Sequence, residues 1–316
     1  MYSWGNDTST WKNPQRYNYD PARRAYLDQN AATAKPRTYS RRTDPDMSFV
    51  SPLNKIIETQ SEHPLIVGID VTGSMAHWPA EIFDRLPLLY QTLSQYKPDL
   101  EISFCAIGDA NSDNFPLQVN NFGKGPALDD HIRALAAEGG GGGQSKETYE
   151  LFGHFMNTHV RMPNARLPFL IMFGDEGFYE KIRPDQVSAL IGDKIESELE
   201  SRTMWYELSK KFNMYMLRKP YQNSAEDNIR QQWESVLGAE KVIQLPSAER
   251  AVDIAMGIIA KHYGQFGDFT QSMSARQDPA TVNAVMQSLR YVPDAGSTRS
   301  QIIGAQASKK SKLLTP

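Results

Sequence analysis

One stretch, residues 66–75 with the sequence IVGIDVTGSM, constrains the fold more than any other part of the chain. Its first four residues are apolar and mostly β-branched, which predicts a strand buried on both faces of a sheet. Asp70, Thr72 and Ser74 follow at once, so the strand leads into three side chains that carry oxygen donors. In an open α/β fold, polar residues in this place lie at the carboxyl edge of a parallel sheet, where ligands bind.

The chemistry of these donors points to a hard cation. Carboxylate and hydroxyl oxygens suit Mg²⁺, with Mn²⁺ or Ca²⁺ as alternatives, better than Zn²⁺ or copper. The histidines His77, His131, His154 and His159 form no i,i+4 pair and have no cysteine partner, which argues against a zinc site. We therefore expect a magnesium-type site that begins at Asp70.

Strand and helix patterns alternate from residue 65 onward, which is typical of βαβ units and a parallel sheet. Apolar runs predict strands at 65–70, 100–108, 167–174, 213–217 and 241–245, with a short edge strand at 116–122. Amphipathic patterns predict helices at 79–96, 126–138, 149–160, 226–237 and 248–263, and further helical patterns fill 184–211. The predicted fold class is α/β: a Rossmann-like, doubly wound, mostly parallel sheet of five to six strands flanked by helices.

Composition divides the chain into three parts. Residues 1–61 form a polar N-terminal arm that contains aromatic residues, and residues 62–265 form the α/β domain. Residues 266–316 form a C-terminal extension with one short helix near 279–290 and a basic, flexible tail. Formal charge is +3 in residues 1–60, +3 in residues 266–316 and −9 between them. The acidic centre argues against nucleic-acid binding by the central domain. The basic arms are compatible either with docking on the acidic body of a neighbouring copy or with solvated tails.

The sequence also predicts where the protein resides. It has no apolar run of about 18 residues that could span a membrane, and the N-terminus lacks the pattern of a signal peptide. The single cysteine, Cys105, lies within an apolar run, which predicts a buried structural thiol and excludes an internal disulfide. These features favour a cytoplasmic protein with no membrane contact.

The motif Asp70-Val71-Thr72-Gly73-Ser74 resembles the D-x-S/T-G-S signature of von Willebrand factor A (vWA) domains. That signature opens the metal-ion-dependent adhesion site of the family. The resemblance implies a vWA fold over residues 62–265 and a cation held by three loops. It assigns Asp70, Thr72 and Ser74 to the first loop, Thr148 to the second and Asp175 to the third.

The second and third loops depart from the family pattern. Glycines 139–143 precede Gln144, where a hydroxyl residue would usually follow. Ser145 therefore competes with Thr148 for the ligand role, and Glu147 is a candidate for an additional carboxylate near the ion. In the third loop the family usually has Thr-Asp-Gly, whereas this chain has Gly-Asp-Glu-Gly at 174–177, which adds Glu176.

The resemblance implies a non-enzymatic, metal-dependent protein-binding module of the intracellular type. Its partner would offer an Asp or Glu side chain to the cation, and intracellular members of the family often work beside AAA+ ATPases in multiprotein assemblies. A second interpretation comes from the D-x-D/T-G-T loop of haloacid-dehalogenase-like phosphotransferases. There Asp70 would be the nucleophile and Asp175 a magnesium ligand. A third is a structural assembly subunit with a degenerate metal site.

Overall fold

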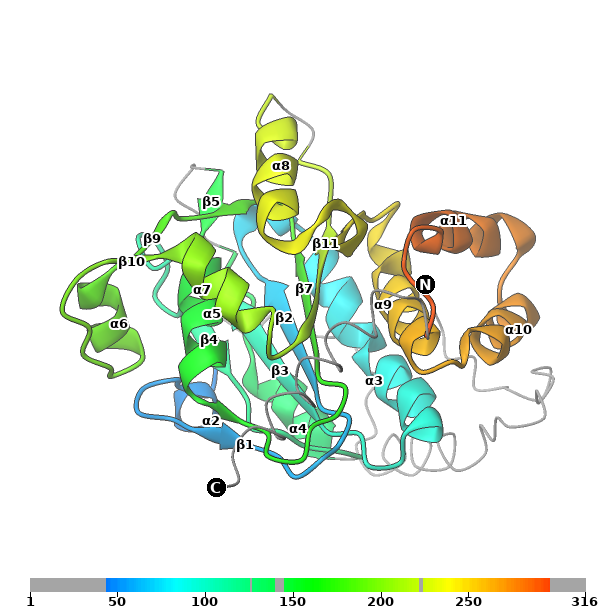
Figure 1. Ribbon diagram of the computed structural model, residues 1–316, viewed down its shortest axis with the longest axis horizontal. Coiled ribbons are helices and arrows are strands. Elements are labelled where there is room, and N and C mark those ends of the chain that lie inside the picture. Colours follow the sequence, from blue (N-terminus) through cyan, green and yellow to red (C-terminus); the bar gives the residue numbers. More distant parts are fainter. Residues whose placement is uncertain (1–43, 126, 140–144, 222–223, 296–316) are drawn as a thin grey trace, which may run out of the picture.

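A six-stranded sheet runs through the centre of the protein (Figure 1). The computed structural model describes residues 44–125, 127–139, 145–221 and 224–295. From one edge of the sheet to the other, the strands are β12 (Val242–Gln244), β11 (Asn213–Arg218), β7 (Phe169–Gly174), β2 (Leu65–Asp70), β3 (Ile102–Ile107) and β4 (Leu117–Val119).

All neighbouring strands in this sheet are parallel except β3 and β4, which form an antiparallel pair at one edge. Counted along the chain from the β4 edge, the strand order is 3-2-1-4-5-6, the order of a doubly wound nucleotide-binding sheet. The predictions of a mixed α/β fold and of an antiparallel edge strand are therefore confirmed. The order reverses between β2 and β7, so this boundary is the switch point at which ligands bind in such folds.

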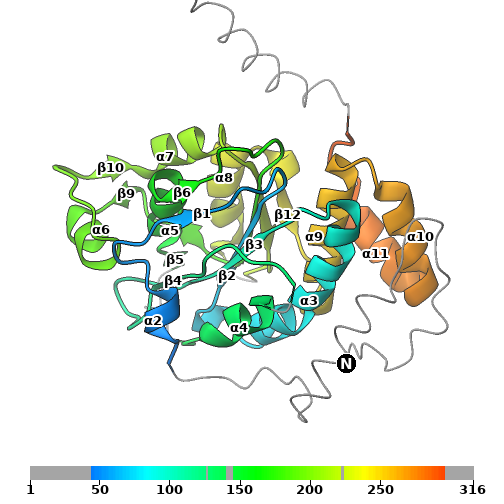
Figure 2. The same cartoon turned by 90° about the horizontal axis from the view of Figure 1, so that it is seen from below.

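Helices cover both faces of the sheet (Figure 2). One face carries α3 (Trp78–Tyr96), α4 (Ala127–Ala134) and α9 (Ala248–His262), with α10 (Phe266–Arg276) and α11 (Pro279–Leu289) packed outside α9. The other carries α5 (Tyr149–Thr158), α7 (Ser201–Leu208) and α8 (Glu226–Leu237), with α6 (Pro184–Leu190) beyond α5.

Side chains alternate between the two faces along the strands, as a doubly covered sheet requires. Leu65, Val67 and Ile69 of β2 pack toward α3 and α9, and Ile66 packs toward α5 and α7. Between them Gly68 admits a close approach, because a Cβ there would lie 2.8 Å from the Phe152 ring. The buried apolar run of β2 therefore fixes the position, relative to the sheet, of the loop that begins at Asp70.

Short elements complete the described chain. They are α2 (Met47–Val50), two 3₁₀ turns, η1 (Gly73–Met75) and η2 (Ala239–Lys241), and three two-stranded ladders. The ladders pair β1 (Ile57–Glu58) with β6 (Val160–Arg161), β5 (Lys146–Glu147) with β8 (Gly177–Phe178), and β9 (Lys181–Ile182) with β10 (Leu199–Glu200). The β5–β8 ladder matters most for the site, because it joins the predicted second and third loops.

Two segments differ from the sequence prediction. The helical pattern over 184–211 is divided into α6 and α7, because Gly192 adopts a positive φ of 94° that ends the first helix. The C-terminal extension contains two helices rather than one. The helix α10 was missed because its sequence, FGDFTQSMSAR, has weak helix formers, and burial of Phe269 and Met273 holds it in place.

Other predictions meet the structure only in part. Cys105 is buried, and burial raises the pKa of its thiol to about 12, which suits a structural role. None of the helices within the described ranges has the length and apolar character needed to cross a bilayer. Residues 1–43 and 296–316, which hold most of the predicted N-terminal arm and the basic tail, lie outside the described residues.

Candidate metal centre

The first loop holds its polar side chains against the end of β2. The Asp70 Oδ1 atom accepts hydrogen bonds from the Thr72 amide at 3.0 Å and from the Thr72 hydroxyl at 2.6 Å. This Asx-type turn is followed by η1, whose first residues place the Ser74 hydroxyl 3.3 Å from that of Thr72. The local sequence thus turns three oxygen donors toward one another at the sheet edge.

The third loop adds a second carboxylate. Asp175 follows β7 directly, and its Oδ1 atom accepts a hydrogen bond from the Ser74 hydroxyl at 2.8 Å. Asp70 and Asp175 are both fully buried. The structure therefore joins four of the predicted ligand residues into one row of oxygens across the switch point between β2 and β7. We call Asp70, Thr72, Ser74 and Asp175 the oxygen row.

The spacing within the oxygen row can be compared with what a cation requires. Neighbouring oxygens lie 2.6, 3.3 and 2.8 Å apart in chain order. Oxygens on adjacent corners of a Mg²⁺ octahedron lie about 2.9 Å apart, because the metal–oxygen bonds are about 2.0–2.1 Å long. These distances are those of hydrogen-bonded oxygens as well as of adjacent metal ligands, so the donor set is compatible with a hard divalent cation.

Two residues of the predicted second loop take other positions. The Thr148 hydroxyl donates to the carbonyl oxygen of Gly108 at 2.6 Å and accepts from the amide of Ala110 at 2.8 Å. These bonds tie it to the loop after β3 rather than to the oxygen row. Ser145 contributes its carbonyl oxygen to the Gly177 amide at 3.1 Å. Whether either hydroxyl serves as a ligand stays a prediction, and residues 140–144 are outside the described residues.

A group of buried acids surrounds the oxygen row. We call six buried carboxylates the sheet-edge cluster: Asp70, Asp109, Glu147, Glu150, Asp175 and Glu176. Burial, and then the charges of neighbouring acids, raise the pKa values of Asp70, Glu147, Glu150 and Glu176. Three oxygens in it, Glu147 Oε2, Glu150 Oε1 and Glu176 Oε2, have no hydrogen-bond partner among the described residues. Buried charge without a counter-ion is costly, so the cluster favours binding of protons or cations.

The pKa shifts show how strongly these acids resist ionisation. Burial and the neighbouring Asp175 carboxylate raise the pKa of Asp70 to about 7, against hydrogen bonds that lower it. Burial, with Asp70 as the next cause, raises the pKa of Glu147 to about 11. Burial raises the pKa of Glu176 as well, and Glu147 shares a hydrogen bond with it. The predicted additional carboxylates Glu147 and Glu176 therefore lie together beside Asp70.

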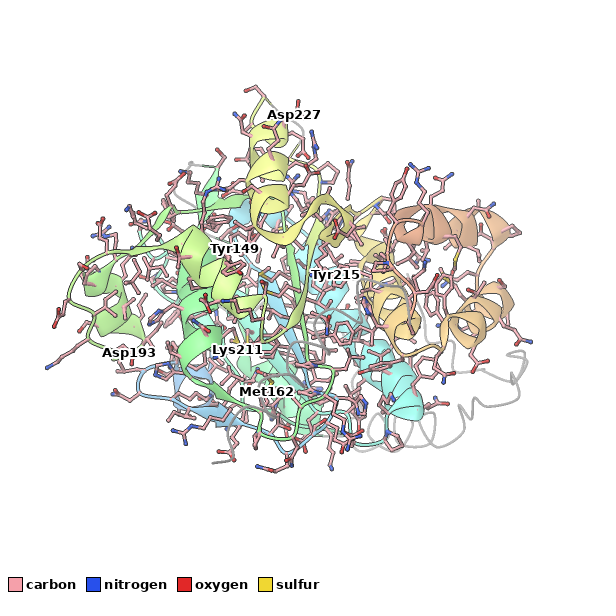
Figure 3. The ribbon with its side chains drawn as sticks, viewed as in Figure 1. Tyr149, Met162, Asp193, Lys211, Tyr215 and Asp227 are labelled. Atoms are coloured by element: carbon pink, nitrogen blue, oxygen red, sulfur yellow. The ribbon has the colours of Figure 1, made fainter. Side chains whose placement is uncertain are left out.

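Tyr149 supplies a contact that the sequence did not suggest. Tyr149, labelled in Figure 3, is the first residue of α5. Its hydroxyl donates to the Asp70 Oδ2 atom at 2.6 Å. The ring reaches Asp70 over Gly174, where a Cβ would lie 1.8 Å from the tyrosine oxygen. Only glycine at 174 leaves that space free, so the departure from the family's Thr-Asp-Gly is matched by the position of Tyr149.

Basic residues at the end of β11 also enter the site. Lys219 Nζ donates to Asp175 Oδ2 at 2.9 Å and to the carbonyl oxygen of Ser74. Arg218 donates to the carbonyl oxygen of Asp175 at 3.1 Å and pairs with Glu226 of α8. Sequence reasoning missed both residues, although their place at a strand end on the same sheet edge was a usable signal.

The described acids of the site do not form a metal-binding group of their own. Among the described residues, no three His, Cys, Asp or Glu side chains are arranged as a metal-binding group. The oxygen row contains only two carboxylates, and its other donors are hydroxyls. The fit to a cation therefore depends on mixed carboxylate and hydroxyl donors rather than on a carboxylate cage.

Comparisons with known proteins leave the family open. No protein-family model matches the chain, and no curated protein matches it. The pilus adhesin SpaC from Lactobacillus rhamnosus GG, in an open conformation, aligns with a TM-score of 0.46 and 9% identity over 69% of this chain and 31% of that one. Proximal thread matrix protein 1 from the mussel byssus aligns with a TM-score of 0.46 and 10% identity over 66% of this chain and 49% of that one. The chain thus spans less than half of either protein, and likenesses of this strength carry no argument about function.

Proposed function

We propose that this chain is a metal-dependent protein-binding module with a vWA-type domain, which binds a carboxylate of a partner protein through a Mg²⁺-type cation. The observation that carries the proposal is the oxygen row, drawn from two loops at the switch point of the sheet. The antiparallel β4 at the edge of an otherwise parallel sheet also agrees with the family's order of elements. The cytoplasmic location and an assembly that contains an AAA+ ATPase remain part of this proposal.

The hydroxyl and carboxylate residues of the oxygen row would have different roles toward a cation, because they differ in charge. The hydroxyls of Thr72 and Ser74 bring oxygen to the cation without adding negative charge, and Asp70 and Asp175 balance its charge. When bound, the cation supplies an electrophilic coordination position that attracts an acidic side chain from the partner. Tyr149 and the Thr72 amide hold Asp70 in one orientation by hydrogen bonds.

The phosphotransferase alternative has less support from the geometry. A nucleophilic Asp70 would need an accessible oxygen, but its side chain is buried and both of its oxygens accept hydrogen bonds. Lys219, a basic group at the same sheet edge, contacts Asp175 rather than Asp70. We therefore place the binding module first, and the degenerate structural subunit is the outcome if no cation binds.

Thermal unfolding tests the proposal most directly. The melting temperature of the wild-type protein should rise when EDTA is replaced by millimolar Mg²⁺ or Mn²⁺, because a ligand that binds the folded state stabilises it. Asp70→Ala should abolish the rise, and replacement of the exposed Glu196 by Ala should leave it intact. An unchanged melting temperature in the wild type at millimolar metal would contradict the proposed site.

The carboxylate-binding step has its own measurement. Water-proton relaxation of the Mn²⁺-loaded protein should fall when acetate or a short Asp-containing peptide is added, because a carboxylate displaces water from the cation. A peptide with Asn in place of Asp is the matched control. Equal effects of the two peptides would leave metal binding intact but overturn carboxylate recognition.

A further inference from the structure

Lys219 places its ammonium group beside the oxygen row, against Asp175 Oδ2 and the backbone carbonyl oxygen of Ser74. It is the first residue after β11, and its amide donates to the carbonyl oxygen of Gly174 at 2.9 Å, which fixes its backbone beside the end of β7. From there its ammonium group reaches Asp175 Oδ2 at 2.9 Å and the carbonyl oxygen of Ser74. A single charged nitrogen thus contacts two residues of the oxygen row.

This ammonium is the counter-ion of an otherwise unpaired group of acids. Within the described ranges, no other lysine, arginine or histidine forms an ion pair with any of the six carboxylates of the sheet-edge cluster. Lys146 lies at the same end of the sheet, but it pairs with Glu180, which is outside the cluster. The charge on Lys219 therefore has no substitute within this part of the chain.

We propose that Lys219 is an internal counter-ion that competes with the divalent cation for the oxygen row and so sets the affinity of the site. The inference rests on the proposed function, because it concerns the same site. The ammonium group and a divalent cation repel each other, and both are attracted by Asp175. One must leave when the other binds.

The lysine side chain is able to leave. Its stem is four flexible carbons long, and 20% of its side-chain surface is exposed, against 1% for Asp175. The Lys219 side chain can therefore move into solvent, whereas the Asp175 carboxylate stays buried when the ammonium group leaves it. In the absence of metal, Lys219 would hold Asp175 and the Ser74 carbonyl in place; in its presence, the side chain would move outward.

Binding of Mn²⁺ alone, measured by titration calorimetry, tests the competition. Lys219→Met should tighten Mn²⁺ binding roughly tenfold, within the usual range of coupling between two binding events. It should also lower the melting temperature in EDTA and enlarge the rise on adding metal. Lys219→Arg keeps the positive charge and should bind Mn²⁺ nearly as the wild type does. Lys146→Met is the matched control, because it removes one positive charge from the same end of the sheet.

A second measurement uses the wild-type chain and needs no variant. Lysines are acetylated with a small amine-reactive reagent, and the rate at each lysine is read by peptide mass spectrometry. Acetylation of Lys219 should become faster when Mg²⁺ is added, and acetylation of Lys146 should not change. By the reciprocity of linkage, the cation that is hindered by the ammonium must also displace it.

The outcomes separate this inference from the proposed function. If the wild type binds Mn²⁺ and Lys219→Met binds it equally or more weakly, competition is wrong and the metal site stands. If Lys146→Met tightens binding as much as Lys219→Met, the effect is general charge and the inference is also wrong. If no variant binds Mn²⁺, the proposed site and the competition both fail.

Discussion

Charge is buried in two places in this protein, and the two clusters are built differently. Between α3, α9 and α10, the fully buried Asp253 pairs with Arg250 at 3.1 Å; burial raises the pKa of Asp253, and the charges of Arg250, Arg276 and Arg85 oppose that rise. We call these four residues the helix cluster. In the sheet-edge cluster, by contrast, the neighbours of Asp70 and Glu147 are other acids, which raise the pKa values further.

The contrast distinguishes a structural use of buried charge from one that is open to a ligand. The helix cluster carries its own cations, which balance the charge of Asp253, although both Asp253 carboxylate oxygens lack a hydrogen-bond partner among the described residues. The sheet-edge cluster has six carboxylates and, among described residues, one paired lysine. Since uncompensated charge opposes burial, the second cluster is where an external cation or proton gains most. Three experiments test this difference.

The largest effect is expected in the helix cluster. Asp253→Ala removes the carboxylate that offsets three arginines and should lower the free energy of unfolding by about 3 kcal/mol. Urea unfolding in EDTA and in Mg²⁺ should give the same loss, because no cation from solution is used there. Glu196→Ala, at an exposed position, should change stability by less than about 0.5 kcal/mol. Rescue of Asp253→Ala by Mg²⁺ would erase the distinction between the clusters.

The next effect is a pH dependence at the sheet edge. The pKa of Glu147 is raised to about 11 in the folded state, so the fold keeps a proton that the unfolded chain releases above the ordinary carboxyl range. In EDTA, the wild type should therefore lose stability relative to Glu147→Gln between pH 5 and 7, at up to about 1.4 kcal/mol per pH unit. Urea midpoints across this range, with Glu196→Gln as control, measure the slope. A difference that does not vary with pH would mean that Glu147 is ionised in the fold.

The smallest effect concerns the hydrogen bond from the Tyr149 hydroxyl to Asp70, a carboxylate that has a neutral donor rather than a cation as its partner. Tyr149→Phe removes the donor to Asp70 Oδ2 and should lower the free energy of unfolding in EDTA by about 1 kcal/mol. The exposed Tyr206→Phe should have no measurable effect. Equal stabilities of Tyr149→Phe and the wild type would show that the carboxylate needs no neutral donor, which would weaken the contrast with the arginine-paired Asp253.

The sequence predicts the central sheet well because its strands are continuous apolar runs. The run before Asp70 and the run before Asp175 are apolar throughout, so both strand ends, and with them the first and third loops, can be placed without a structure. The helix α10 escapes prediction, because its weak helix formers are held by tertiary packing of Phe269 and Met273, which no local pattern records.

The site divides along the same line. Asp70, Thr72 and Ser74 are neighbours in the chain, so the proximity of their side-chain oxygens can be predicted from spacing alone. Lys219 reaches Asp175 only because β11 lies beside β7, a pairing that depends on the order of strands. Likewise, the bonds of Thr148 to Gly108 and Ala110 depend on how two separate loops meet. Contacts between loops therefore could not be predicted from the sequence.

The closeness of Gly174 to the Tyr149 hydroxyl has a consequence for recognising relatives of this chain. A side chain at 174 and a tyrosine at 149 exclude each other, because the tyrosine oxygen already fills the space of the missing Cβ. Substitution at these two positions should therefore be correlated among homologous proteins: glycine with tyrosine, or threonine with a smaller residue. This paired choice would be a second criterion, beside the D-x-T-G-S motif, for recognising proteins homologous to this chain.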